Sequence, residues 1–257
     1  MVALLATLGT ACETVDEDER FIGPIENVTP SDNLKNILIE DFTGQKCINC
    51  PRATDIIHSL QNSYGKDRII AVAIHGGTFA LSAPKGLATE ESKAYHTQWG
   101  VESWPKGMVN RQGGLLEFSA WSAQAIKFLQ EKAYVNMNAE NSFYNSEDNS
   151  INVNVELSAT QDIDAKLQVW LIENGIIAKQ IMPDGNIKND YEHNHIFRAT
   201  VNGMDGEGVN LAVNDTITKQ YKYTISDKTW KPENMAIVSF VANGNGVLQV
   251  IETPVIK

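Results

Sequence analysis

The sequence has little that would let it cross a membrane or bind nucleic acid. None of its apolar runs reaches the roughly 18–20 residues that a membrane-spanning helix needs. The chain has 21 lysine and arginine residues against 32 aspartate and glutamate residues, which gives a formal net charge of −11. Because a phosphate backbone is bound by a basic surface, this charge argues against nucleic-acid binding. The hydrophobic content of 42% is typical of a folded globular protein.

Cysteine is also scarce, and no cysteine follows Cys50. A fold held together by several disulfides is therefore excluded. Cys12 stands alone near the N-terminus, whereas two residues separate Cys47 from Cys50. This spacing predicts separate roles for the single cysteine and for the pair.

Residues 1–12 resemble the end of a bacterial lipoprotein signal peptide, because a short apolar stretch and small residues precede Cys12. The resemblance implies that Cys12 is acylated and anchors the protein to a membrane without spanning it. Residues 13–19 are rich in aspartate and glutamate and resemble the surface-export signals of Bacteroidetes lipoproteins. Residues 1–30 are therefore predicted to be a signal remnant and an acidic tether. The alternative is an irregular N-terminal segment with a chance cysteine.

Residues 31–138 are predicted to form an α/β domain. Apolar, β-branched runs predict buried strands, and apolar residues at helical spacing predict helices between them. The expected elements are a strand over 37–42, a helix over 51–64, a strand over 68–74, a helix over 90–99, a strand over 107–110 and a helix over 120–134. Alternating strands and helices are typical of an α/β fold.

Residues 139–257 are predicted to form an all-β domain. Apolar residues alternate strictly with polar ones from Ile151 to Leu157, and Asn, Asp and Gly separate the runs that follow. Strands are expected over 151–157, 166–172, 176–181, 195–201, 209–213, 218–225, 236–242 and 247–251. With no helical stretch among them, these short strands favour an antiparallel β-sandwich.

The motif Cys47-Ile48-Asn49-Cys50 lies between a predicted buried strand and a predicted helix. The free N–H groups and partial positive charge of a helix N-terminus stabilise a thiolate, which lowers the pKa of a cysteine from its usual value of about 8.5. Cys47 is therefore expected to be an exposed nucleophile, and Cys50 is expected to resolve the mixed disulfide.

Two alternatives for the cysteine pair stay open. A permanent disulfide without turnover suits an exported protein. A zinc site would need two further ligands, for which the candidates are His58, His75, His96, His193 and His195.

The segment from Ile37 to Cys50 resembles the active-site strand and turn of thioredoxin. By that resemblance, Asp41 matches the buried carboxylate that assists proton transfer. The segment from Trp99 to Pro105 resembles the one that carries a cis-proline facing the disulfide, which implies a cis bond before Pro105 and a platform there for the substrate backbone. Lys46 replaces the usual tryptophan, and Ile48-Asn49 replaces Gly-Pro, so the resemblance leaves the substrate and the redox potential open.

The cluster from Tyr191 to Arg198 is the most unusual segment of the β region. His193 and His195 are two residues apart, so on a strand they would share one face and could hold a metal ion with a third ligand. A polar start of a strand is the alternative, and no third ligand is evident.

Nearly the whole chain resembles the 28-kDa outer-membrane lipoprotein family of Bacteroidetes, which pairs a thioredoxin-like domain with an immunoglobulin-like sandwich. The resemblance is carried by residues 40–51, 169–176 and 191–198. It implies attachment to the outer membrane, on the periplasmic or the outer face. No cofactor is expected.

The leading hypothesis is a thiol–disulfide oxidoreductase that acts on the thiols or disulfides of exported proteins. In it, Cys47 is the nucleophile, Cys50 the resolving thiol, Asp41 a proton-transfer aid and Pro105 the substrate platform. The main alternative is a surface binding or adhesion lipoprotein in which the thioredoxin fold is a scaffold, and a purely structural envelope component is a third. The sequence leaves open the redox partner, the direction of electron flow and the oligomeric state.

Overall fold

The structure is a computed structural model that describes residues 33–82 and 86–256. The predicted tether and the predicted lipid-attachment residue Cys12 lie outside these residues. Within them, no helix is both long enough and apolar enough to cross a membrane.

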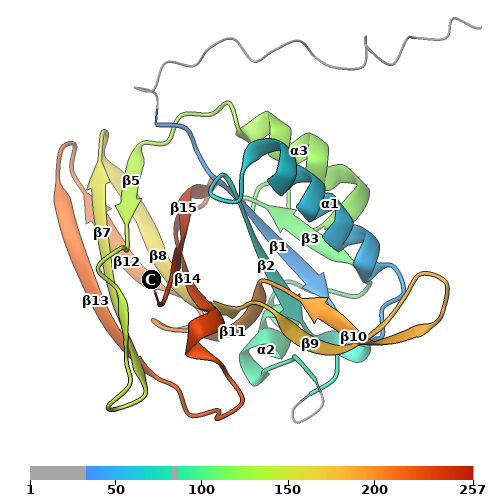
Figure 1. The fold of residues 1–257 in the computed structure, drawn as a ribbon. Helices are drawn as coiled ribbons and strands as arrows, with labels where there is room; N and C mark the ends of the chain where they lie inside the picture. Colours follow the sequence, from blue (N-terminus) through green and yellow to red (C-terminus); the bar gives the residue numbers. More distant parts are fainter. Residues whose placement is uncertain (1–32, 83–85, 257) are drawn as a thin grey trace, which may run out of the picture. The chain divides into compact units, whose positions relative to one another are not determined.

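The first half of the described chain is a mixed α/β arrangement, as predicted (Figure 1). Its strands lie in the order β2-β1-β3-β4. β1 and β2 are parallel, β3 is antiparallel to β1, and β4 is antiparallel to β3. The elements are β1 (Ile37–Thr43), α1 (Cys50–Tyr64), β2 (Ile69–His75), a 3-10 turn (Gly77–Phe79), α2 (Glu90–Gln98), β3 (Lys106–Val109), β4 (Leu116–Glu117), a 3-10 turn (Phe118–Ala120) and α3 (Trp121–Phe128). The last helix ends six residues before the expected Tyr134.

The side chains of β1 alternate between the two faces of this sheet. Ile37 and Ile39 pack with residues of α1 and α3, whereas Leu38 and Phe42 pack in a second core with Tyr95 of α2. Helices therefore cover both faces, α1 and α3 on one and α2 on the other. Asp41 is in phase with Ile37 and Ile39, so its side chain lies on the face that α1 covers.

After α3 the described chain is all β, and every strand pairing within this part is antiparallel. The elements are β5 (Val135–Asn138), β6 (Phe143–Asn145), β7 (Ser150–Ala159), β8 (Ile163–Glu173), β9 (Ile176–Ile181), β10 (Ile187–His193), β11 (Ile196–Thr200), β12 (Glu207–Leu211), β13 (Thr216–Thr224), a 3-10 turn (Pro232–Asn234), β14 (Met235–Asn243) and β15 (Gly246–Pro254). The expected antiparallel β region is confirmed.

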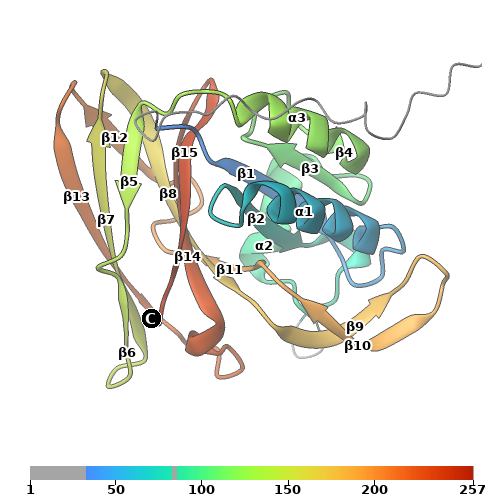
Figure 2. The ribbon, with the colours of Figure 1, turned by 45° about the horizontal axis from the view of Figure 1, so that its top comes forward.

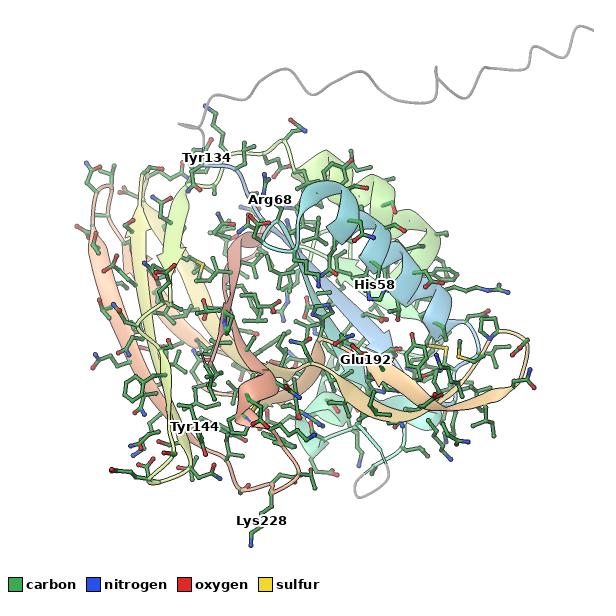
Figure 3. All side chains as sticks on the ribbon, in the orientation of Figure 1. His58, Arg68, Tyr134, Tyr144, Glu192 and Lys228 are labelled. Carbon is green, nitrogen blue, oxygen red and sulfur yellow. A yellow bond between two sulfur atoms is a disulfide. The ribbon has the colours of Figure 1, made fainter. Side chains whose placement is uncertain are left out.

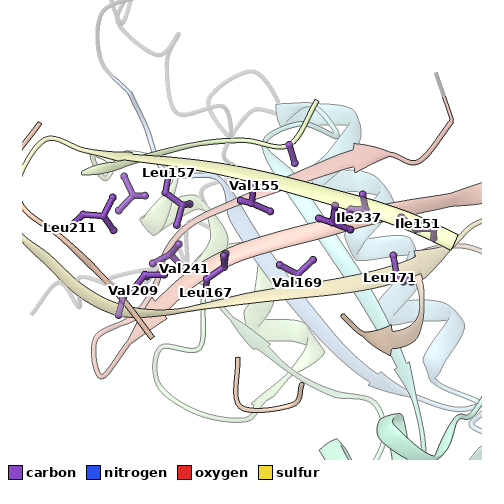
Figure 4. Close-up of a cluster of buried hydrophobic side chains, with 14 of the residues drawn as sticks. Ile151, Val155, Leu157, Leu167, Val169, Leu171, Val209, Leu211, Ile237 and Val241 are labelled. Carbon is purple, nitrogen blue, oxygen red and sulfur yellow. The ribbon is translucent and has the colours of Figure 1, made fainter. Parts of the chain in front are cut away.

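A smaller sheet of β13, β7, β5 and β6 packs against the strands of a larger one (Figure 4). The predicted alternation of β7 is observed, because Ile151, Val153, Val155 and Leu157 are all buried. They pack against β8 and β14, for example against Val169. Each buried aliphatic side chain of this kind contributes roughly 1.5–3 kcal/mol through the hydrophobic effect.

The larger sheet has nine strands and contains elements from both halves of the chain. Its order is β15-β14-β8-β11-β2-β1-β3-β4, with β12 beside β8. The two halves meet where β11 runs parallel to β2, with Ile196 opposite Ala73. Strands from both sides of the expected boundary at residues 138 and 139 therefore share one sheet, and residues 33–257 form one compact unit. The division into domains over 31–138 and 139–257 remains a prediction.

Strands β9 and β10 form a hairpin outside both large sheets. Figures 1 and 2 show it beside the end of β1 and the start of α1. The sequence does not predict β10, and its placement corrects the expectation for the two histidines. His193 is the last residue of β10, whereas His195 lies in the turn to β11 with a positive φ of 58°. They do not share one face of a strand.

Candidate functional site

Cys47 and Cys50 form a disulfide that closes the turn between β1 and α1. Cys50 is the first residue of α1, and Pro51 follows in the first helical turn, where its missing N–H has no intrahelical partner. The backbone N–H of Cys50 donates a hydrogen bond to Sγ of Cys47 at 3.1 Å. The predicted strand–turn–helix setting is confirmed, and the helix N-terminus favours negative charge on this sulfur.

Both cysteines are buried, with exposed fractions of 3% for Cys47 and 2% for Cys50. The expectation of an exposed Cys47 is therefore wrong for this structure. The cause is the β9–β10 hairpin, which Figure 3 shows beside the yellow disulfide. Gln180 of β9 donates from Nε2 to the carbonyl oxygen of Cys47 at 3.0 Å.

The hairpin is also bonded to the segment just before the disulfide. The N–H of Ile181 donates to the carbonyl oxygen of Gln45 at 2.9 Å, and Nε2 of Gln45 donates to the carbonyl oxygen of Lys179 at 3.1 Å. Strand alternation turns the buried Gln180 toward the cysteines and leaves Ile177 60% exposed on the other side. Three hydrogen bonds thus hold the β9–β10 hairpin over the cysteine pair.

Asp41 lies beneath α1 with 2% of its surface exposed, and its Oδ1 has no hydrogen-bond partner. Burial raises the pKa of this carboxyl group to about 8. The cause is desolvation, which disfavours the charged form. At neutral pH the group is therefore mostly a neutral acid that can donate a proton.

Asp41 and Cys50 line the same cavity, together with His75, His193 and His195. The space open to the centres of water-sized molecules is about 30 Å³. Burial lowers the pKa of His193 and of His195 to about 4, so both rings are neutral at neutral pH. Each of the three histidines has one ring nitrogen that is buried and without a hydrogen-bond partner.

The Trp104–Pro105 peptide bond is cis, as the resemblance implied. In the register of β1 and β3, Lys106 lies opposite Phe42, so Pro105 comes at the end of β1 from which the chain leads to Cys47. Pro105 is itself buried. The residues predicted for the site therefore gather at one end of the sheet, and their roles remain predictions.

Sequence reasoning missed Gln180, and it named His193 only as a candidate metal ligand. Gln180 was not singled out, although a polar residue in an inward phase of an alternating strand is a usable signal. His193 reaches the cavity only because the hairpin folds back over α1, which no local pattern shows. Within residues 33–82 and 86–256, no group of three or more His, Cys, Asp or Glu side chains is arranged to hold a metal ion.

A family model described as "Outer membrane protein Omp28" matches residues 92–256, which is more than half of the chain. The chain belongs to the Omp28 family of outer membrane proteins. The matched part of this Omp28-family chain includes Pro105 and the β9–β10 hairpin, while Cys47 and Cys50 precede it. No curated protein matches the chain.

Among solved structures, the Omp28-family chain is similar to HBP35 of Porphyromonas gingivalis, with a TM-score of 0.68 and 16% sequence identity. The similarity covers 86% of this chain and 76% of HBP35, and at this identity it shows the fold alone. A β-glucosidase from Kluyveromyces marxianus matches with a TM-score of 0.27 and 13% identity over 49% of this chain and 15% of the enzyme. The putative ApaA protein from Bordetella pertussis matches with a TM-score of 0.24 and 14% identity over 47% of this chain and 86% of that protein. These two similarities are too weak to support an argument.

Proposed function

We propose that this Omp28-family protein is a thioredoxin-like thiol–disulfide exchange protein, anchored to the outer membrane by acylated Cys12, that acts on exported proteins. The observation that carries the proposal is the placement of Cys50 and the partnerless, buried carboxyl group of Asp41 on one cavity. A disulfide that only braces a turn does not need such a group. Burying it is costly, and strongly perturbed groups of this kind gather at functional sites.

The arrangement of the first half supports a thioredoxin-like fold. The strand order β2-β1-β3-β4, the helices on both faces and the cis bond before Pro105 are the features that such a fold requires. The packing of the smaller sheet on the larger one likewise supports the proposed immunoglobulin-like sandwich. In the proposal, this second region recognises a partner or holds the redox site away from the membrane.

The proposed exchange begins when a client thiolate attacks Sγ of Cys47. A bond forms between the client sulfur and Cys47, the bond between Cys47 and Cys50 breaks, and Cys50 leaves with the electron pair as a thiolate. In the proposal, Asp41, which lines the same cavity as Cys50, gives its proton to this sulfur. A second client thiol then displaces Cys47, which leaves a client disulfide and a dithiol in the protein. The reverse sequence reduces a client disulfide.

The burial of Cys47 requires that the hairpin move before a client can reach the sulfur. The same burial favours a second candidate function, a binding lipoprotein in which the fold is a scaffold and the disulfide is structural. An exposed fraction of 3% at Cys47 is the specific observation for this alternative.

Equilibration of the full chain with glutathione buffers separates the two functions. Exchange predicts a reduction potential above about −300 mV and a trapped mixed disulfide at Cys47 in the Cys50→Ser variant. The Cys47→Ser variant is the matched control and is expected to trap no client. A potential far below about −300 mV, together with no trapped species in Cys50→Ser, assigns the pair a structural role.

A further inference from the structure

Two buried polar atoms from opposite halves of the chain line the same cavity without a hydrogen-bond partner. They are Oδ1 of Asp41 on β1 and Nε2 of His193 at the end of β10. Buried polar groups are nearly always hydrogen-bonded, to the protein or to water. A water molecule needs about 10–15 Å³ of such space, and the cavity provides about 30 Å³. A water molecule held in this cavity would give each of these atoms a hydrogen-bond partner.

The surroundings of the His193 ring favour one tautomer. Backbone groups of Ala178 and Lys179 beside the ring raise its pKa, which is the effect of accepting carbonyl oxygens. Because Nε2 has no partner, we assign the proton that these oxygens accept to Nδ1. In a neutral ring with a proton on Nδ1, Nε2 carries a lone pair and accepts.

Asp41 has the complementary character. Burial raises its pKa to about 8, so at neutral pH it carries a proton that needs an acceptor. A neutral acid and a neutral imidazole with a free lone pair suit each other without either becoming charged. Two charged partners here would pay a large desolvation cost.

We propose that His193 is a positioning residue for thiol–disulfide exchange: its Nε2, through water in the cavity, accepts the hydrogen bond of the Asp41 carboxyl group and holds that proton beside Cys50. This inference rests on the proposed function. In the exchange, the bond between Cys47 and Cys50 breaks, and the Asp41 proton passes to the departing Cys50 thiolate. The resulting carboxylate then accepts a hydrogen bond from the bridging water, whose other proton points to Nε2.

His195 differs in the ring nitrogen that has no partner. Its Nε2 lies 3.5 Å from the amide nitrogen of Gln61, a donor, so the nitrogen without a partner is Nδ1, which then carries the proton and cannot accept a hydrogen bond. His75 packs edge-on against His193, with ring centroids 5.5 Å apart, and burial lowers its pKa. The titratable or charged groups that face the pair are Cys50 and His58 of α1, His75 of β2, Tyr191 and Glu192 of β10, and His195, with Arg198 of β11 acting on His75.

Nitrogen NMR of the histidine rings in the oxidised full chain tests the proposed hydrogen bond independently of any redox activity. His193 is expected to be the Nδ1–H tautomer, and its Nε2 resonance is expected to show a step near pH 8, where Asp41 titrates, besides its own step near pH 4. The step near pH 8 is expected to vanish in Asp41→Asn. His96 of α2, which packs against Phe42 on the opposite face of the sheet from Asp41, is the control and should show no such step. An Nε2–H tautomer, or a step that appears at His75 instead, overturns the proposal.

The rate at which dithiothreitol reduces the disulfide tests the role of His193 in exchange. This rate is corrected for the fraction of dithiothreitol that is present as thiolate at each pH. His193→Leu, which has no acceptor, is expected to lower this rate at neutral pH about tenfold. This is less than the roughly 10²–10⁴-fold of a full proton-transfer contribution, because Asp41 itself is retained. The midpoint of the pH dependence of the rate is expected to move away from about 8. His193→Gln keeps an acceptor and should stay within about twofold of the wild type with an unchanged midpoint.

The outcomes separate this inference from the proposed function. If dithiothreitol opens the disulfide of the wild type and of His193→Leu with the same pH profile, the proposed role of His193 is wrong and the exchange function stands. If dithiothreitol does not open the wild-type disulfide at any pH, the proposed function is wrong. A step in the NMR titration would then report only a structural hydrogen bond.

Discussion

The burial of Asp41 couples the chemistry of this single residue to the stability of the fold. Its pKa is 3.8 in an unfolded chain and about 8 here. Between these values the folded protein binds more protons than the unfolded chain, so the free energy of unfolding falls with rising pH. The contribution of Asp41 is fully present below about pH 4 and is lost as the pH rises through about 8.

Asp41→Asn is therefore expected to raise the free energy of unfolding by about 1–3 kcal/mol near pH 8 and by less near pH 5, because the amide is never ionised. Urea denaturation of the oxidised protein at both pH values measures the difference. The histidines titrate similarly in both proteins and cancel in this comparison. Asp55→Asn, an exposed acid on α1, is the control. An effect of Asp41→Asn that is equal at the two pH values would contradict the raised pKa.

A second residue-scale prediction concerns the ion pair of Glu40 and Arg111. Glu40 is fully buried and accepts two hydrogen bonds from the guanidinium group, at 2.8 and 2.9 Å. Arg111→Met leaves this carboxylate without a partner, and it is expected to lower the free energy of unfolding by about 3–5 kcal/mol. Lys106→Met removes the partner of the exposed Glu117 and should cost less than about 1 kcal/mol in the same denaturation assay. Equal costs would contradict the importance of burial.

Asp41 and Pro105 could be predicted from the sequence because each lies at a fixed offset from a local motif. Asp41 is in the inward phase of a buried strand, and Pro105 comes directly before β3. The exposure of Cys47 could not be predicted in this way. Its cover is Gln180, 133 residues further along the chain. The local sequence pattern thus located the residues of the candidate site, while their access to solvent depends on tertiary contacts.

At the scale of elements, the predictable strands were those with a clear apolar pattern. β1 is buried throughout, whereas the side chains of β7 alternate between the core and a less buried face. β1 and β7 lie where their apolar pattern predicts them. β10 was missed because five of its seven residues, Ile187 to Asp190 and Glu192, are solvent-exposed and all of these except Ile187 are polar. Its pairing with β9, rather than its own composition, makes it a strand.

The hairpin itself is expected to control access to the disulfide. Gln180→Ala removes the side-chain hydrogen bond to the Cys47 carbonyl, and one such bond contributes roughly 0.5–1.5 kcal/mol. The rate of reduction by dithiothreitol is therefore expected to rise about two- to tenfold. Lys179→Ala, which changes an exposed side chain on the same strand, is the matched control and should leave the rate unchanged. Equal rates in all three proteins would show that the hairpin is not the barrier.

At the scale of the whole molecule, one buried cluster draws on both halves of the chain. Trp170 of β8 is fully buried there and lies against Tyr95 of α2 and Phe240 of β14, with ring centroids 5.3 and 4.8 Å apart. Aromatic pairs at such separations stabilise a fold beyond their buried area. Because the two halves share this cluster and a sheet, we expect them to unfold together.

Trp170→Ala is therefore expected to lower the free energy of unfolding by about 3–5 kcal/mol, and to do so throughout the described chain. Native-state hydrogen exchange distinguishes this from a local effect. If the halves unfold together, the most protected amides of β1 and of β7 lose protection by the same free energy, because both exchange through global unfolding. Phe143→Ala, at a site that is 52% exposed on β6, should change neither. Loss of protection in β7 alone would mean that the β region unfolds separately, which is the behaviour that two independent domains would show.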